Sequence, residues 1–74
     1  MTPEQCKAAR AMMGLSQDQL AQRSGVAVST IIPFEQNQRT PYASTVEKLR
    51  TALEAAGIDF IEENGGGPGL RMRK

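Results

Sequence analysis

The chain has 74 residues, a net charge of +1 at pH 7 and three aromatic side chains, so it forms one small folded unit with a mainly aliphatic core. A single cysteine excludes an internal disulfide, and without histidine there is no plausible set of metal ligands. We expect a cytoplasmic protein without metal or cofactor, since the chain start lacks a signal-peptide pattern and no apolar run approaches the length of a membrane span.

The first predicted helix covers residues 3–13. Thr2 and Gln5 match a capping box, with a proline between them at the first helical position. Apolar side chains then recur at helical spacing, and Gly14 is suited to end the helix. Because Cys6 lies among these apolar positions, we expect it to pack as a small hydrophobic residue rather than to serve redox chemistry.

Two more predicted helices follow closely. Ser16 and Gln19 repeat the capping-box pattern, and Gly25 ends the second helix after about two turns. The third helix comes after a turn of a few residues and runs through Ile31 toward Gln36.

The start of this third helix departs from common helix chemistry. Ala27 stands where a capping serine or threonine is usual, and Pro33 removes one backbone donor. If Ser29 caps the helix instead, Pro33 falls near the first turn, where proline is tolerated. We therefore predict a third helix that starts late or bends.

A fourth helix is predicted after the polar loop at residues 37–41. From about Ala43 apolar residues form one stripe at helical spacing, and Gly57 is suited to end the helix. The stripe consists of Val46, Leu49, Ala52, Leu53 and Ala56. Charged residues surround it, which is typical of a helix that covers a core with one face.

Residues 58–74 change in character. Residues 58–62 and 70–74 alternate loosely between apolar and charged side chains around a glycine-rich turn, which predicts a β-hairpin, with a flexible tail as the alternative. The basic residues of the second strand either contact phosphate, face solvent or pair with acidic residues of the first. Opposite charge on the two strands favours pairing of Arg71, Arg73 and Lys74 with Asp59, Glu62 and Glu63.

A two-stranded hairpin is marginally stable alone, so we expect this one to pack against the fourth helix or to join its counterpart in a second subunit. The chain then divides into a helical domain, residues 1–57, and a β extension, residues 58–74, that serves dimerisation. The candidate dimer contacts are Ile58, Phe60, Leu70 and Met72.

The second and third predicted helices match the requirements of a helix-turn-helix. Ala21 is small where the two helices approach each other, and Gly25 lies in the turn, where a positive φ is expected. Ile31 and Phe34 lie three residues apart on the side of the third helix that would be buried.

Several separate spacings agree with one known pattern: GLSQDQLAQRSGV at residues 14–26, then Ser29–Ile31, Phe34–Glu35 and Arg39–Pro41. With them the chain resembles the Cro and phage-repressor type of helix-turn-helix proteins, the Xre family, over roughly residues 3–57. The resemblance implies a mainly α, lambda-repressor-like fold of four helices, here with a C-terminal β-hairpin or strand. It also implies a homodimer that places one recognition helix per subunit in successive major grooves of operator DNA.

The resemblance also assigns residues to the DNA. Gln17 and the loop around Gln38 and Arg39 match positions that contact phosphate. Base readout falls to the third helix, where only two hydroxyl side chains are present and the apolar residues suit thymine methyl groups. The predicted DNA-binding set is Gln17, Val28, Ser29, Thr30, Pro33, Gln38, Arg39 and Thr40. In some members, residues matching Arg10 and Glu35 form a buried ion pair.

We predict a sequence-specific transcriptional regulator, a dimeric repressor that places residues 28–36 in the major groove. The alternative is a protein-binding antiactivator or antitoxin on the same fold, because the low net charge and the apolar Val28 and Ile32 also suit a protein partner. We expect no enzymatic activity, since the chain has no histidine and no nucleophile with a base at a recognisable spacing.

Overall fold

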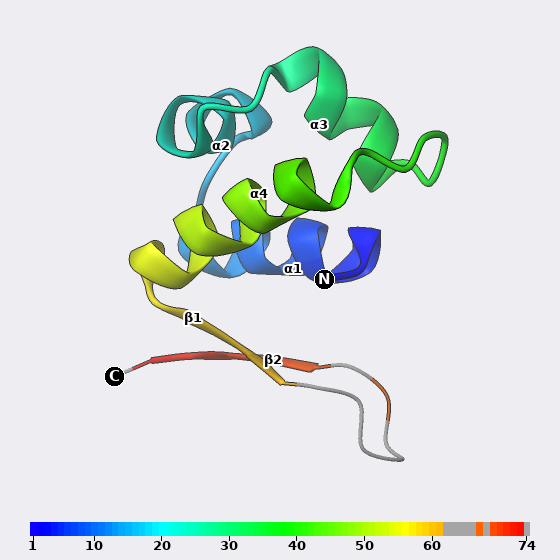
Figure 1. The fold of residues 1–74 in the computed structure, drawn as a ribbon. Coiled ribbons are helices and arrows are strands. Elements are labelled where there is room, and N and C mark those ends of the chain that lie inside the picture. The colour runs from blue at the N-terminus through cyan, green and yellow to red at the C-terminus, as the bar shows by residue number, and fades with distance from the viewer. Residues whose placement is uncertain (62–66, 68, 74) are drawn as a thin grey trace.

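The computed structural model describes residues 1–61, 67 and 69–73. Within them the chain forms four helices followed by two strands: α1 (Pro3–Met13), α2 (Gln17–Ser24), α3 (Val28–Glu35), α4 (Ala43–Ala56), β1 (Ile58–Ile61) and β2 (Gly69–Met72). Figure 1 shows α2 and α3 on one side of α1 and α4, and the two strands on the other. The mainly helical fold with a β-hairpin is confirmed.

Local chemistry at the helix ends explains where α1 and α2 begin and end. The side chains of Thr2 and Ser16 each accept a hydrogen bond from a backbone amide three residues on, and the glutamine there bonds back to the cap in both helices. Gly14 and Gly25 end the two helices with φ of 68° and 74°. This left-handed conformation is costly for residues other than glycine. Both helices therefore end at the glycine that the sequence predicted, and both predicted ends are confirmed.

Of the two outcomes predicted for α3, the late start is wrong and the bend stays a prediction. The helix begins at Val28, and Ala27 precedes it without any side-chain cap. The amides of Thr30 and Ile31 both donate to the carbonyl of Ala27, so the first turn forms from backbone bonds alone. Pro33 lies inside the helix. Burial of one apolar face stabilises this short helix although its local signals are weak.

The core draws on every helix and on β1. Its buried members are Cys6, Ala9, Leu15, Leu20, Val26, Ile31, Phe34, Leu49, Ala52, Leu53 and Ile58. The three leucines Leu20, Leu49 and Leu53 are completely buried, and each contributes about 1.5–3 kcal/mol through removal from water. Ala21 packs against this cluster, as expected of a small residue between α2 and its neighbours.

The strands form an antiparallel hairpin that packs on the helices. Ile58 pairs with Met72 and Phe60 with Leu70, while β1 contacts α4 and β2 contacts α1. The side-chain amide of Gln5 donates to the carbonyl of Gly69 at 3.1 Å, which fixes β2 to α1. The hairpin is therefore part of the folded domain, and its predicted packing against the fourth helix is confirmed.

One of the residues predicted to contact a second subunit, Ile58, does not lie on the surface. Ile58 is completely buried in the core of its own chain, so it has no surface to offer a second subunit. The reason is its position directly after α4, where the strand turns back under the helices. The division of the chain after residue 57 stays a prediction, although Ile58 on its far side belongs to the same core.

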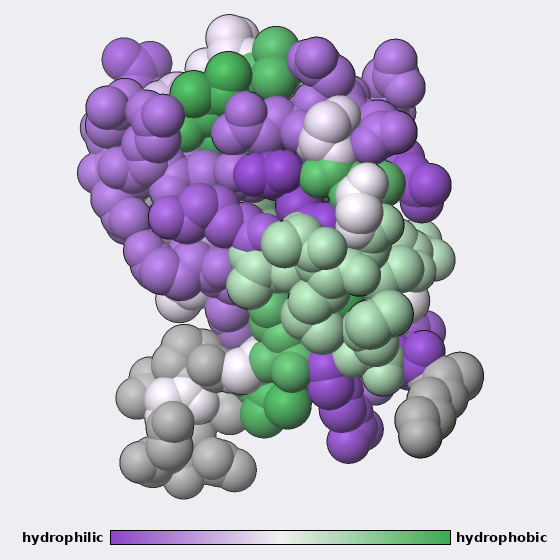
Figure 2. All heavy atoms as spheres, turned by 180° about the vertical axis from the view of Figure 1, so that it is seen from behind, coloured by the Kyte–Doolittle hydropathy of each residue, from purple (hydrophilic) through white to green (hydrophobic). Residues whose placement is uncertain are grey.

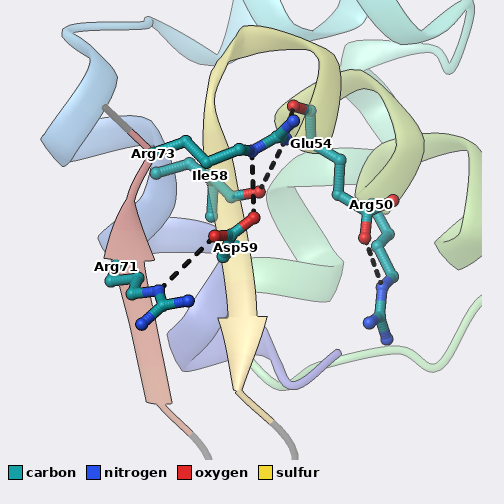
Figure 3. A network of polar contacts seen from close by, with 6 residues as sticks. All are labelled: Arg50, Glu54, Ile58, Asp59, Arg71 and Arg73. Carbon is teal, nitrogen blue, oxygen red and sulfur yellow. Dashed lines mark hydrogen bonds and ion pairs between the residues drawn. The ribbon is translucent and has the colours of Figure 1, made fainter.

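Figure 3 shows how the two strands are held to the end of α4 by charged groups. Arg73 forms an ion pair with Asp59 at 2.9 Å, and its guanidinium also donates to the main-chain carbonyl of Glu54, near the C-terminus of α4. Arg71 pairs with the other oxygen of Asp59 at 3.4 Å. A cation at a helix C-terminus is favourable. Pairing of both arginines with Asp59 is confirmed; Glu62, Glu63 and Lys74 lie outside the described residues.

Candidate nucleic-acid interface

A buried carboxylate at the end of α3 ties three helices together. Arg10 on α1 binds both oxygens of Glu35, with Nε and Nη2 each 2.7 Å from an oxygen. Gln17 at the start of α2 donates its side-chain amide to the same carboxylate at 3.0 Å, and Cys6 donates its thiol at 3.2 Å. The structure thus places Arg10 and Glu35 in the ion pair that the resemblance implied, with two additional donors.

These contacts set the protonation of the cluster. Burial alone would raise the pKa of the Glu35 carboxyl, but the hydrogen bonds from Arg10, Gln17 and Cys6 outweigh it and hold the pKa below its ordinary value. Burial, together with the neighbouring carboxylate, raises the pKa of the Cys6 thiol to about 12. Cys6 therefore stays protonated at neutral pH and acts as a donor, a role that its apolar setting in the sequence did not indicate.

Gln17 has a different partner from the one that the resemblance assigned to its side chain. Its amide group is bound to Glu35, so in this structure the side chain points into the protein rather than toward a phosphate. The amide of Gln19 donates to the Ser16 side chain, so the backbone amides of Gln17 and Asp18 remain, because the first amides of a helix have no partner within it. An anion at this end of α2 would be held by those amides.

A groove lies between the turn that joins α2 to α3 and the segment that leads into α4. It has a volume of about 580 Å³ and is lined by Gly25, Val26, Ala27, Thr30, Arg39, Thr40, Pro41, Tyr42, Thr45 and Lys48. We call it the turn groove. It brings the predicted DNA contacts Thr30, Arg39 and Thr40 together, and no carboxylate is among its lining residues. Two cations and four hydroxyl groups without an acid suit a phosphate-bearing ligand.

Sequence reasoning missed two residues of this groove, Tyr42 and Lys48. Tyr42 is 86% exposed, and an aromatic residue after proline at the end of a polar loop was the available signal. Lys48 lies on α4 and was grouped with the charged surface of that helix. Nothing in a single sequence shows that this surface faces the turn before α3.

The remaining predicted contacts differ in exposure. Ser29 is exposed on α3, whereas Val28 and Pro33 are half-buried. The apolar patch expected from Val28 and Ile32 is smaller than the sequence suggested, because Ile32 is half-buried too. Exposed side chains on α3 that could reach base edges are therefore few, and Ser29 is the most accessible of the predicted set on this helix.

The loop after α3 uses one of its predicted phosphate donors internally. The amide of Gln38 donates to the carbonyl of Pro33 at 2.9 Å, and the amide of Asn37 donates to Phe34 at 3.1 Å. Asn37 adopts a φ of 59°, which closes the end of the helix. Arg39 and Thr40 are exposed and make no hydrogen bond or ion pair within the described part of the chain. Arg39 and Thr40 thus keep side-chain groups that are free to bind a ligand.

Other kinds of site find no support in the residues that the structure describes. No three acidic, cysteine or histidine side chains among them come together as metal ligands. None of the described helices has the length and apolar character needed to cross a membrane.

Comparison with known proteins agrees with this geometry. A family model described as helix-turn-helix, of the Cro/C1 type, matches residues 7–60, from the first turns of α1 to β1. No curated protein matches the sequence. The four helices with their α2–turn–α3 unit fit the lambda-repressor-like fold. The chain therefore belongs to the Cro/C1-type helix-turn-helix family and is a DNA-binding regulator.

Proposed function

We propose that the protein is a dimeric repressor that reads operator DNA with α3 in the major groove. The observation that carries this proposal is the turn groove, where Thr30 at the start of α3 lies beside Arg39 and Thr40 without any lining carboxylate. In this arrangement Arg39 and Thr40 hold the phosphate backbone, which positions α3 over the base edges. A dimer bound at its operator would repress by excluding polymerase from the site.

The base-reading part of the proposal rests on a small set of side chains. The exposed hydroxyl of Ser29 can donate to or accept from a base edge. Val28, Thr30 and Pro33 offer methyl and methylene groups that suit thymine methyls, and DNA shape adds to the discrimination.

A salt titration of duplex binding tests this function. The chain should prefer a duplex selected from a random pool, with affinity falling steeply as salt rises. Arg39→Ala should weaken selected and scrambled duplexes alike and lower the salt slope by about 1, whereas Ser29→Ala should reduce preference at particular base pairs. Arg71→Ala, on the far hairpin, serves as the control for loss of one exposed arginine.

The outcomes separate the two functions that the sequence left open. Binding that stays undetectable at about 50 mM salt would exclude the repressor and favour a protein-binding antiactivator or antitoxin. Equal effects of Arg39→Ala and Ser29→Ala on every duplex would show that α3 is not the reading helix.

The proposed homodimer is supported by an apolar face formed by α1 and β2. Met12 and Met72 are 38% and 52% exposed. A groove of about 550 Å³ on this face is lined by Ala8, Met12, Gly69 and Leu70, together with the polar Thr2, Glu4 and Gln5. Figure 2 shows a broad hydrophobic area that continues down to the hairpin. Exposed apolar side chains gathered on one face favour association. Leu70 and Met72 thus remain dimer candidates, while Phe60 is half-buried with Arg50 stacked 5.2 Å from its ring centre.

The dimer prediction is checked by sedimentation equilibrium. Met12→Glu and Met72→Glu each place a charge on the α1–β2 face and should raise the dimer dissociation constant by about 10-fold or more. Thr51→Glu, which adds a charge to an exposed position of α4, should leave it unchanged. If all three variants associate like the unmodified protein, the dimer uses another surface.

A further inference from the structure

The side chain of Tyr42 makes no hydrogen bond or ion pair with any described residue. It is 86% exposed, more than any other large hydrophobic residue in the described part of the chain. The main-chain carbonyl of Tyr42 accepts hydrogen bonds from the amides of Thr45 and Val46 at the start of α4, but the side chain forms no cap there and is not among the side chains packed against the core cluster. A side chain of this size that contributes nothing to folding is a typical anchor for a binding partner.

The surroundings of Tyr42 indicate what that partner carries. Tyr42 lines the turn groove together with Arg39 and Lys48, one cation from the loop and one from the second turn of α4. Lys48 forms no ion pair or hydrogen bond with any described residue. The groove has no lining carboxylate, so its open side is positively charged beside an aromatic ring with a hydroxyl group. This combination suits a polyanion whose phosphates are separated by apolar sugar rings.

We propose that Tyr42 and Lys48 extend the DNA-binding site onto α4 and hold the sugar-phosphate backbone beside the half-site that α3 reads. The ring of Tyr42 packs against a deoxyribose and its hydroxyl donates to a phosphate oxygen, while the Lys48 ammonium pairs with the neighbouring phosphate. The inference rests on the proposed DNA-binding function. Lys48 would add a second cation, and Tyr42 an uncharged aromatic contact, to the contacts of Arg39 and Thr40. These local contacts would allow DNA binding by a chain whose net charge is only +1.

The test compares three variants on a selected duplex and a scrambled duplex of equal length between about 50 and 200 mM salt. Tyr42→Ala should weaken both duplexes by about 10-fold, since it removes a hydrogen bond to a charged group and the ring contact. Its salt slope should stay unchanged because the side chain is neutral. Lys48→Ala should lower the slope by about 0.9. Tyr42→Phe should recover part of the affinity that Tyr42→Ala loses, because it keeps the ring.

Control measurements distinguish a failure of this inference from a failure of the proposed repressor function. Lys7→Ala removes an exposed cation from α1, outside the groove, and should leave the affinity unchanged. If the unmodified protein binds DNA but Tyr42→Ala and Lys48→Ala bind like it, this inference fails and the repressor proposal stands. If no duplex binds to the unmodified protein, both fail.

Two further results would also overturn the inference. A change of preference between the duplexes in Tyr42→Ala would place the ring against bases rather than backbone. A second such result would be that polyglutamate at an equal concentration displaces the duplex from the unmodified protein but not from Tyr42→Ala. That result would indicate an acidic protein as the partner. Because Tyr42 is exposed, thermal unfolding of its variants should match the parent, so altered binding reports the surface itself.

Discussion

Replacement of Glu35 by glutamine should destabilise the domain by about 3 kcal/mol and lower Tm by more than about 10 °C. Glu35→Gln removes the charge that balances Arg10, whose side chain is only 19% exposed. It also places an amide nitrogen among groups that all donate to this site: Arg10, Gln17 and Cys6. Loss of one partner from a buried pair is costly because the other charge stays behind. Chemical denaturation followed by circular dichroism measures the loss.

Two comparisons decide whether the buried pair is the cause. The double variant Arg10→Met with Glu35→Leu should be more stable than Glu35→Gln, because apolar residues of similar size leave no charge unpaired. Arg71→Ala removes an arginine whose side chain is 72% exposed from its pair with Asp59, and it should change stability by less than about 1 kcal/mol. If Glu35→Gln is no more harmful than Arg71→Ala, the cluster does not hold the three helices together.

The same carboxylate makes stability depend on pH in a defined direction. Its pKa in the folded protein lies below its ordinary value of 4.5, so the unfolded chain takes up the proton first as pH falls. The stabilisation is therefore complete well above pH 4.5 and is lost as pH falls through the lower, folded-state pKa. The difference in unfolding free energy between the parent and Glu35→Gln should be constant near neutral pH and shrink under acid. A difference that grows under acid would contradict the assigned shift.

Ile58→Ala should cost about 2–4 kcal/mol, whereas Ile61→Ala in the same strand should cost less than about 1 kcal/mol. The two substitutions remove the same side chain and lose the same strand propensity, so the difference between them reports burial. Ile58 is completely buried and Ile61 is 41% exposed. Because Ile58 packs in the same core as Leu49 and Leu53, its truncation leaves a cavity beneath the helices.

Urea denaturation of both variants measures this difference, with the slope of the transition as a check on compactness. Equal losses of unfolding free energy in Ile58→Ala and Ile61→Ala would mean that the hairpin packs loosely on the helices and that the helical domain is stable without it. The predicted result would mean that β1 completes the core in each chain before the hairpin serves any contact between chains.

Local sequence determined the ends of α1 and α2. Thr2 and Ser16 bind amides only three residues away, and glycines supply the left-handed conformation at both C-terminal ends. Interactions over three or four residues are visible in a sequence, which is why these boundaries and the helix-turn-helix itself could be predicted. The start of α3 could not, because burial of Ile31 and Phe34 stabilises that helix in place of a cap.

Tertiary structure decided the chemistry of the site. Gln17 is 18 residues from Glu35 and Cys6 is 29 residues from it, yet both donate to its carboxylate. Thr30 and Lys48 likewise line one groove only because α2 packs against both α3 and α4. Side-chain contacts between distant segments depend on how the helices pack, and a single sequence records the helical faces but not which of them meet. Sequence alone therefore determined the family and the helices of this protein, while packing determined which side chains are left free to bind DNA.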